Sequence, residues 1–547
     1  MLVHYRAPLA LAVLLWLALV VTGLATRPLL PVDETRYLAV AWDMWHSGRY
    51  LVPHLNGIEY HHKPPLLFWL INLGWAVFGV SETWGRLVAP LFGLGCVVLT
   101  GVLARLVFRE RPVVAAIAPL VVIGSAFFAL FTTLTFFDTL VAFFTLLGLI
   151  GVWRAAHGHE RQGWCLYALA LGLGILSKGP VQLLDLAPAP LLAPLWITTR
   201  PSSWRRWYAG FGVAVVGGAA IGLAWAIPAA LAGSREFAYM LFVGQSTKRV
   251  VEAAWHERPF WWYVPLSFGL LFPWLWWLAS WRSALTRDTW RAPGIRFCLA
   301  TLVPVFIAFS AISGKQPHYL LPLFPVFALM MAGLLAETIQ RDSFRDARWM
   351  RFPPALLTGV LGAVLTIMTL FAGPIEARWP RLAELLPLPA AAALAGAVLI
   401  LSAVWIVLDQ PRSAAFRVAS LALLTGAALL AVHVGLQPWL LARFDMAGIA
   451  AEIVVAESAG RPVAQTFDYH GQYHFAGRLR RPIAALTKDD AVPWARNNPT
   501  GVIIDYRRDD PAHYPAQPPF IQGYRGRYVV IWPAAEVIAH GRTLFGD

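Results

Sequence analysis

The sequence is poor in charged residues, which make up 14% of its 547 residues, whereas soluble domains contain about a quarter. Hydrophobic residues make up 58% of the chain. Too few polar side chains remain to cover a water-soluble globule of this size. The composition therefore excludes an ordinary soluble protein.

Cysteine is also scarce, and none of the three cysteines suggests a bond. Cys96, Cys165 and Cys298 each lie within an apolar run, and no CxxC spacing occurs. We therefore expect no disulfide framework.

Acidic residues are fewer than basic ones, 30 against 44, which gives a net charge of +14. An excess of this sign can indicate nucleic-acid binding. Here most basic residues lie in short loops between apolar runs, where membrane proteins place them for topology. We therefore expect no nucleic-acid partner.

Apolar runs of roughly 18 to 25 residues recur along the first four fifths of the chain, and each is long enough to cross a bilayer as a helix. They predict about thirteen crossings, and the first is interpreted as an uncleaved span. The predicted spans are 8–26, 85–107, 113–131, 137–154, 163–177, 180–198, 208–231, 262–281, 295–313, 318–338, 353–373, 388–408 and 414–436.

Arginine marks alternate loops, which indicates the side facing the cytoplasm. The arginine-rich loops are 109–111, 154–161, 200–206, 282–296, 341–351 and 412–417. We therefore predict a transmembrane domain over 1–436, with outward loops at 27–84 and 232–262. Short strand-like runs at 462–470, 481–486, 501–508 and 527–532 predict an outward α/β domain over 437–547.

Ionisable residues on the predicted outward side gather at the ends of apolar runs. The first loop supplies Asp33, Glu34, Arg36, Tyr37 and Lys63, later turns supply Asp138, Lys178, Lys315, His318 and Tyr319, and the loop 232–262 supplies Lys248, Arg249, His256 and Arg258. Charges at membrane depth are costly and usually mark a site, although some lysines can simply reach the interface. Cations there would neutralise a phosphate, and a carboxylate could accept a proton, which suits group transfer from a lipid phosphate.

Asp33 precedes a stretch with apolar residues at helical spacing and a stop at Gly48, which predicts an amphipathic helix along the membrane interface. Asp33 would then stand at the N-cap of this helix. Capping alone would explain an aspartate there, so its role stays open on this pattern.

The motifs PVDETRY and SGRYLVPHLNGIEYHHKPPL resemble those of GT-C-fold glycosyltransferases that use polyprenyl-phosphate sugars. The lipid A aminoarabinose transferases are the nearest likeness, and the protein O-mannosyltransferases are more distant. The motifs FDT, SKGP and GKQPHYLLP extend the resemblance along the chain. The family architecture, a membrane helical bundle with juxtamembrane helices and an outward α/β domain, agrees with the predicted elements.

The resemblance implies roles for particular residues. Asp33 and Asp138 match the catalytic acidic positions, and Lys63 and Lys178 match positions that hold the donor phosphate. Arg36 and Arg258 are expected to bind the donor phosphate with them, and the expected substrate-binding residues are Glu34, Tyr37, Tyr60, Lys315, His318 and Tyr319. With a hydroxyl acceptor Asp33 would be the general base, whereas with a phosphate acceptor it would orient the acceptor or stabilise the sugar cation.

One position departs from the resemblance. The aminoarabinose transferases have Glu immediately before the loop-end Lys, where this chain has His62. In that family the Glu pairs with a His matched by His256 to hold zinc, so His62 and His256 are predicted as a structural zinc pair. The departure puts the aminoarabinose substrate in doubt, and we expect no cofactor to be required.

We expect a monomeric bacterial inner-membrane enzyme with its active site and C-terminal domain in the periplasm. Its predicted partners are the bilayer, an undecaprenyl-phosphate-linked sugar as donor, and lipid A, another glycolipid or a secreted protein as acceptor. A lipid-linked-sugar flippase would also need cations, but transporters bind near the bilayer midplane. A membrane scaffold would leave the gathered charges unexplained. His470 and His474 could pair as ligands on a helix, although ordinary surface residues are the simpler expectation.

Overall fold

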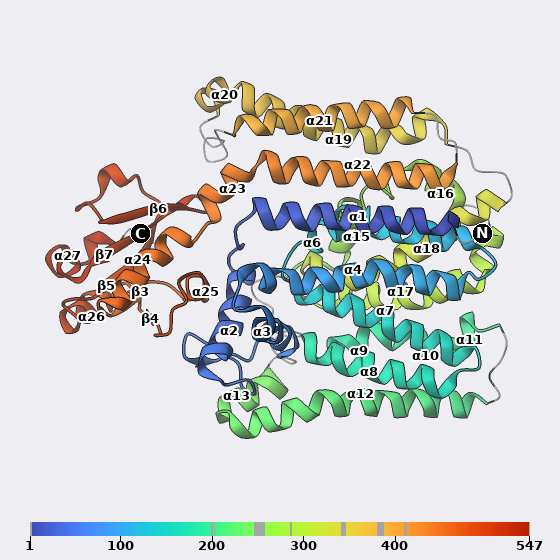
Figure 1. Cartoon of the computed structure of the whole chain (residues 1–547), viewed down its shortest axis with the longest axis horizontal. Coiled ribbons are helices and arrows are strands. Elements are labelled where there is room, and N and C mark those ends of the chain that lie inside the picture. Colours follow the sequence, from blue (N-terminus) through green and yellow to red (C-terminus); the bar gives the residue numbers. More distant parts are fainter. Residues whose placement is uncertain are drawn as a thin grey trace.

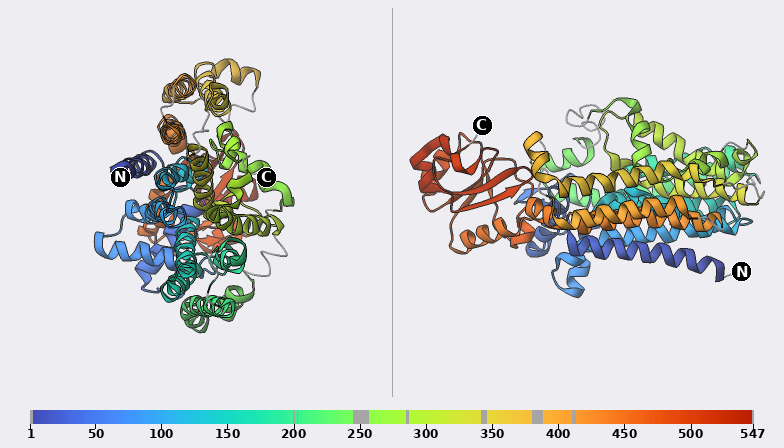
Figure 2. Two further views of the ribbon diagram at one scale, coloured as in Figure 1. Left: turned by 90° about the vertical axis from the view of Figure 1, so that its right-hand side faces the viewer. Right: turned by 90° about the horizontal axis from the view of Figure 1, so that it is seen from above.

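The computed structural model describes residues 3–198, 201, 203–244, 257–284, 287–340, 346–379, 388–409 and 413–545. Long helices lie side by side in a bundle, and the C-terminal domain projects from one end of it (Figure 1). The N-terminus lies at the opposite end, as Figure 1 and the right-hand view of Figure 2 show. The first loop and the C-terminal domain therefore share one end of the bundle, as predicted.

Nine helices within the described ranges are long and apolar enough to cross a membrane. They are α1 (Val3–Thr26), α4 (Glu82–Val107), α7 (Phe137–Ala156), α12 (Trp204–Ala232), α17 (Pro293–Ala311), η4 with α18 (Pro317–Leu323 and Phe324–Gln340), α19 (Arg348–Leu370), α21 (Ala390–Leu408) and α22 (Ala414–Gly435). Each coincides with a predicted span. The chain is a multi-pass membrane protein.

The other four predicted crossings are one less apolar helix and three interrupted runs. They comprise α8 (Glu160–Lys178), α5 and α6 (Pro112–Ile123 and Ala126–Phe131), α9 to α11 (Val181–Leu186, Pro188–Leu191 and Ala193–Trp196), and η2, α15 and α16 (Phe260–Trp262, Tyr263–Leu270 and Leu278–Ala284). Interior prolines remove helix hydrogen bonds, and Pro188 and Pro273 fall at such interruptions. Hydropathy alone could not place these breaks.

The first loop folds over the outer ends of the helices. It contains α2 (Asp33–Ser47), the antiparallel pair β1 and β2 (His54–Leu55 and Ile58–Glu59) and α3 (Leu66–Phe78). Gly48 ends α2 with φ at +72°, as its stop signal predicted. The prediction that Asp33 caps this helix is wrong, because Val32 stands at the N-cap and makes no side-chain capping bond.

The C-terminal domain is built on a five-stranded sheet of order β4-β3-β5-β7-β6. Strands β3 (Val463–Gln465), β4 (Ala484–Ala485) and β5 (Val502–Arg507) are parallel, and β7 (Arg527–Pro533) runs antiparallel between β5 and β6 (Phe520–Tyr524). Its helices are α23 (Gln437–Phe444), α24 (Ala447–Ser458), α25 (His474–Gly477), α26 (Ala491–Asn497) and α27 (Ala534–His540), with short 3-10 turns at Pro511–His513 and Gly541–Leu544. The strand-like runs in the sequence predicted every strand of this sheet except β6.

Successive side chains along β5 and β7 point to opposite faces of the sheet, and both faces are covered. Ile504 and Ile531 pack with the helix α24, whereas Ile503 and Trp532 belong to a second core with residues of α26 and α27. Both strands are therefore buried on two sides and read as continuous apolar runs.

The C-terminal domain is seated on the first loop. The Trp42 indole donates to the Leu479 carbonyl at 2.8 Å, and the rings of Trp75 and Phe475 stack with centroids 5.4 Å apart. The remaining described elements are α13 and η1 (Arg235–Tyr239 and Met240–Gly244), η3 (Arg287–Arg291) and α20 (Ala372–Arg378). All three cysteines are free, as expected.

Candidate functional site

Asp33 opens α2 at the outer end of the bundle and remains accessible. Its side chain is 44% exposed. The Tyr37 hydroxyl donates to Asp33 Oδ1 at 3.2 Å, and the Arg36 guanidinium lies 3.8 Å from the same oxygen. One helical turn thus supplies an oriented carboxylate with free volume on its solvent side.

Tyr37 connects Asp33 to the second acidic residue. The Tyr37 ring is buried and packs edge-on against Phe137, with centroids 4.8 Å apart. Burial raises the pKa of the Tyr37 phenol well above its ordinary value, and the charges of Asp33 and Asp138 both add to the rise. Both carboxylates therefore lie near this one hydroxyl.

Asp138 lies in the first turn of α7, and its carboxylate contacts the ammonium of Lys178, the last residue of α8. The Lys178 ammonium contacts Asp138 Oδ1 at 2.5 Å, and the two side chains are only 9% and 4% exposed. Lys178 Nζ also lies 4.5 Å from the Tyr319 ring centroid. Gly179 follows at φ +88°, a conformation that favours glycine and turns the chain away directly after the lysine.

Lys63 and His318 approach the same turn from two other elements. Lys63 Nζ lies 5.8 Å from the Phe137 ring centroid, and the His318 ring lies 5.7 Å from that of Phe136. Four segments that are far apart in sequence therefore meet around the start of α7. This brings together Asp33, Arg36, Tyr37, Lys63, Asp138, Lys178, His318 and Tyr319, which we call the outer charge group.

Tyr60 is a buried packing residue next to the outer charge group. Its ring is 4% exposed and packs 6.2 Å from Phe68 and 5.3 Å from His62. It therefore fixes the strand end that leads to Lys63, and a contact between Tyr60 and substrate stays a prediction.

Glu34 is fully buried, and its carboxylate is already occupied by protein groups. It pairs with Arg27 and accepts the backbone N–H groups of Leu30 at 3.0 Å and Thr135 at 2.8 Å. These bonds tie the start of α2 to the turn before α7. Glu34 thus sets the spacing of Asp33 and Asp138, and its direct contact with substrate stays a prediction.

Lys315 and Arg258 lie beside the outer charge group, and a hydrogen bond joins the two loops that contain them. The buried Lys315 ammonium donates to the Arg258 carbonyl at 2.8 Å and to that of Ile312 at 2.5 Å. The Arg258 guanidinium lies 6.0 Å from the Trp262 ring centroid. Lys315 therefore organises the loop, and the predicted contacts of both residues with substrate stay predictions.

The predicted zinc pair falls partly beyond the described residues. His62 is exposed, with its ring 4.4 Å from that of His61. His256, Lys248 and Arg249 lie outside the described residues. In the described ranges, no three His, Cys, Asp or Glu residues gather as metal ligands would. The donor set present in the described part is therefore smaller than a structural zinc site needs.

The C-terminal domain borders the outer charge group through one loop. His470 keeps part of its surface exposed, and its pKa is lowered by partial desolvation of the ring and by Arg36, with Asp468 and Asp33 acting in the opposite direction. A methyl group added at Gly471 would lie 3.0 Å from Ala39 of α2, which shows how closely the loop approaches. The sequence offered no signal for this proximity, since 437 residues separate His470 from Asp33.

His474 does not form a ligand pair with His470, and the expectation that it is a surface residue is wrong. It is 4% exposed, and its Nδ1 lies 2.6 Å from the Tyr469 hydroxyl. It begins the short helix α25 while His470 precedes it, so the two rings do not share a helical face.

An apolar groove of about 240 Å³ runs between α15, α17 and α18. Its lining includes Leu270, Val303, Phe306, Leu320, Phe324 and Phe327. Leu320 follows His318 and Tyr319 on the same 3-10 turn, so the groove begins within two residues of the outer charge group.

Comparison with known proteins agrees with this arrangement. Residues 62–231 match the family model described as dolichyl-phosphate-mannose-protein mannosyltransferase. The undecaprenyl phosphate-alpha-4-amino-4-deoxy-L-arabinose arabinosyl transferases of Pseudomonas savastanoi pv. phaseolicola and Pseudomonas fluorescens are 30% and 31% identical over 62% of this chain. The matched parts span 62% and 58% of those relatives' own lengths.

Two solved structures have the same fold. The crystal structure of ArnT from Cupriavidus metallidurans bound to undecaprenyl phosphate matches with a TM-score of 0.72 and 20% identity, over 96% of this chain and 97% of that one. Its apo state matches with a TM-score of 0.71 over 99% and 98% of the two chains, also at 20% identity. The resemblance inferred from the motifs is confirmed: the chain has the GT-C fold and resembles the lipid A aminoarabinose transferases.

Proposed function

We propose that the chain is an inverting glycosyltransferase that moves a sugar from undecaprenyl phosphate to an envelope acceptor such as lipid A, on the periplasmic side of the inner membrane. The observation that carries this proposal is the outer charge group, in which an accessible carboxylate stands beside several cations. The names of the similar transferases support it. The donor is supported by the fold match to the structure of ArnT from Cupriavidus metallidurans bound to undecaprenyl phosphate.

The donor fits the group by charge and by shape. A lipid phosphate at the membrane surface is stabilised by Lys63, which is only half-buried, with Lys178 behind it. The apolar groove next to His318 suits the first part of a polyprenyl chain, because it offers hydrocarbon contacts and few polar ones.

Transfer is a displacement at the anomeric carbon of the sugar. An acceptor oxygen forms the new bond while the bond to the phosphate oxygen breaks, and undecaprenyl phosphate leaves with the electron pair. The cations stabilise the departing charge, and the carboxylates stabilise the positive character of the sugar. With a hydroxyl acceptor Asp33 takes its proton, whereas an ionised phosphate acceptor needs no base and Asp33 stabilises the sugar cation.

A protein hydroxyl is the second candidate acceptor. The family model that matches residues 62–231 carries a name that specifies protein mannosylation. A serine or threonine acceptor would require the proton transfer to Asp33, so the two acceptors differ in their need for a base.

Mass spectrometry of envelope lipids and glycoproteins from a deletion strain tests the proposal. We expect one sugar-modified species to disappear and to return with the wild-type chain but not with Asp33→Asn. An unchanged set of lipids and glycoproteins would reject the transferase function.

A further inference from the structure

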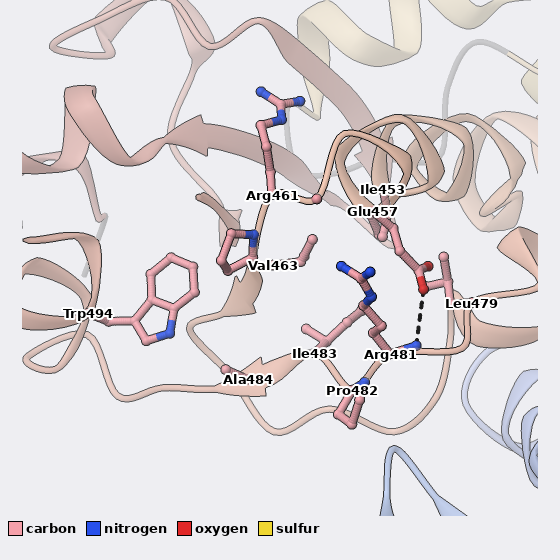
Figure 3. Close-up of a pocket in the computed structure, with 12 residues that line it drawn as sticks. Ile453, Glu457, Arg461, Val463, Leu479, Arg481, Pro482, Ile483, Ala484 and Trp494 are labelled. Atoms are coloured by element: carbon pink, nitrogen blue, oxygen red, sulfur yellow. Dashed lines mark hydrogen bonds between the residues drawn. The ribbon is translucent and has the colours of Figure 1, made fainter. Parts of the chain in front are cut away.

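The C-terminal domain contains a cavity of its own, which the outer charge group does not use. It has a volume of about 290 Å³ and lies between the end of α24, the edge of β3 and β4, and the helix α26. Figure 3 shows the residues that line it, among them Glu457, Arg461, Val463, Arg481, Ile483 and Trp494. None of the residues of the outer charge group lines this cavity.

The charge of the lining favours an anion. Two arginines and one glutamate line the cavity, which leaves one excess positive charge. Glu457 Oε1 accepts the backbone N–H groups of Arg480 at 3.2 Å and Arg481 at 3.1 Å, so this carboxylate holds the loop. In Figure 3 the Arg481 side chain extends from that loop toward Val463.

Arg461 is half-buried at the edge of the same cavity, and in Figure 3 its side chain extends away from Val463 and Trp494. Its Nε is buried and has no hydrogen-bond partner among the described residues. Arg481 is therefore the arginine that extends into the cavity, and phosphate matches the forked geometry of a guanidinium.

Trp494 gives the cavity an aromatic wall. Its ring faces the same space in Figure 3, and a methyl group added at Gly501 would come within 2.8 Å of it, so the ring is closely packed from behind. A fixed indole offers a flat surface for the C–H face of a pyranose, whereas a free phosphate gains nothing from it. Aromatic walls with a few placed polar groups are typical of small-ligand sites.

The floor of the cavity is rigid and is joined to the first loop. The Asn56 amide donates to the Ile483 carbonyl at 2.8 Å and accepts its N–H at 2.7 Å. Gly57 sits against Pro482 at φ +78°, with only 3.1 Å between an added methyl group and the proline ring. The cavity is therefore preformed and keeps a fixed relation to the loop that leads to Lys63.

We propose that this cavity binds the headgroup of a phosphorylated sugar, with the Arg481 guanidinium on the phosphate and the Trp494 indole on the ring. Its volume is at the lower end of small-ligand sites, about 300 Å³, and suits a single sugar phosphate. Resting on the proposed function, this site holds a phosphosugar-bearing acceptor while its reacting end reaches Asp33.

Equilibrium dialysis of the full-length protein in detergent, with radiolabelled glucose 1-phosphate as the probe, tests this site. The Lys63→Ala background is used so that binding at the outer charge group does not contribute. Arg481→Gln in that background should weaken binding at least about tenfold, because it removes a charge-assisted contact from an exposed side chain. Arg508→Gln, an exposed arginine of the same domain that does not line the cavity, is the matched control and should leave binding unchanged.

The assay separates this site from the proposed function, since it measures binding and needs no transfer. Glucose and inorganic phosphate should each compete more weakly than unlabelled glucose 1-phosphate. Equal binding by Arg481→Gln and its parent, loss of binding in Lys63→Ala alone, or equal competition by inorganic phosphate would each overturn the assignment.

Discussion

The two acidic residues of the outer charge group stand in opposite surroundings. Asp138 is 4% exposed and bonded to Lys178, so its carboxylate holds the Lys178 ammonium in place. Asp33 is 44% exposed and is oriented by the Tyr37 hydroxyl. Asp33 is therefore the carboxylate that an acceptor can reach, and Asp138 sets the position of the cation.

Asp33→Asn should abolish transfer without disturbing the fold. The amide keeps the shape of an exposed side chain but loses the negative charge that stabilises the sugar cation and, with a hydroxyl acceptor, cannot take the proton. Loss of a general base typically lowers kcat about 10²- to 10⁴-fold. The transfer rate and the thermal stability are measured together, with the exposed Asp489→Asn as control. Turnover at the wild-type rate would remove Asp33 from the chemistry.

Lys178→Met should destabilise the bundle by about 3–5 kcal/mol, because it leaves the buried Asp138 carboxylate unpaired. Adding Asp138→Leu should recover much of that loss, since no charge then remains buried. Denaturant unfolding in detergent measures both variants.

The exposed pair of Arg206 and Glu160, 72% and 33% exposed, gives the matched comparison for Lys178. Arg206→Met should cost less than about 1 kcal/mol. Equal effects of Arg206→Met and Lys178→Met would mean that the Asp138 pair is solvated rather than buried.

At the scale of elements, Glu34 connects three segments that no local pattern relates. Glu34 itself lies in the first turn of α2. It pairs with Arg27 after α1, and it accepts the Leu30 N–H before α2 and the Thr135 N–H before α7. Burial opposes its ionisation, but Arg27 outweighs this and lowers the pKa of Glu34. The distance between Asp33 and Asp138 thus depends on one buried carboxylate.

Glu34→Gln should leave the Arg27 guanidinium buried without a countercharge and destabilise the protein by about 3 kcal/mol or more. It should also speed hydrogen exchange at residues 132–136 and slow transfer, although Asp33 and Asp138 both remain. Glu452→Gln, at an exposed glutamate of the C-terminal domain, serves as control. Unchanged exchange at 132–136 in Glu34→Gln would show that this carboxylate does not hold the turn.

The sequence predicted the long helices better than the interrupted ones. Nine spans follow from unbroken apolar runs, because such a run has no other stable place than a bilayer or a core. The run 113–131 splits at Gly124 and Ser125 because the chain turns there between α5 and α6. That turn is held by a bond from the Ala126 N–H to the Phe272 carbonyl, a contact 146 residues away in sequence.

Some residues of the candidate site could likewise be predicted from the sequence, and others could not. Asp33, Lys63, Asp138 and Lys178 could be predicted, because charges at the ends of apolar runs are conspicuous. The buried roles of Glu34 and Lys315 could not, since each depends on carbonyl or N–H groups from distant loops. The burial of His474 likewise depends on Tyr469 and on packing that spacing does not record.

At the scale of the whole molecule, the C-terminal domain is fixed to the first loop and not merely tethered by α23. Trp42, Asn56 and Trp75 of the first loop all contact it. Because the same loop contains Asp33 and Lys63, movement of the domain would shift the outer charge group. The domain thus lies against the loop that contributes to the outer charge group.

Acid should loosen this domain through His474. Burial lowers the pKa of His474 from 6.5 to about 4, so the unfolded chain binds a proton below pH 6.5 while the folded domain stays neutral. Stability is full above pH 6.5 and falls by about 3 kcal/mol as the pH drops to 4.

Hydrogen exchange of β5 and β7, corrected for intrinsic rates, measures this pH dependence. His474→Phe should flatten the profile between pH 6.5 and 4, whereas His513→Gln, at an exposed histidine of the same domain, should not. An identical profile in wild type and His474→Phe would assign the acid sensitivity to another group.

The central claim is that cations from separate turns hold the phosphate of a polyprenyl donor beside Asp33. The affinity of the purified protein for undecaprenyl phosphate, measured for wild type, Lys63→Ala and Lys488→Ala, tests it most directly. Lys63→Ala should bind about ten- to a hundredfold more weakly, because one charge-assisted contact is lost, while Lys488→Ala in the C-terminal domain should match wild type. Equal affinity of wild type and Lys63→Ala would contradict the claim.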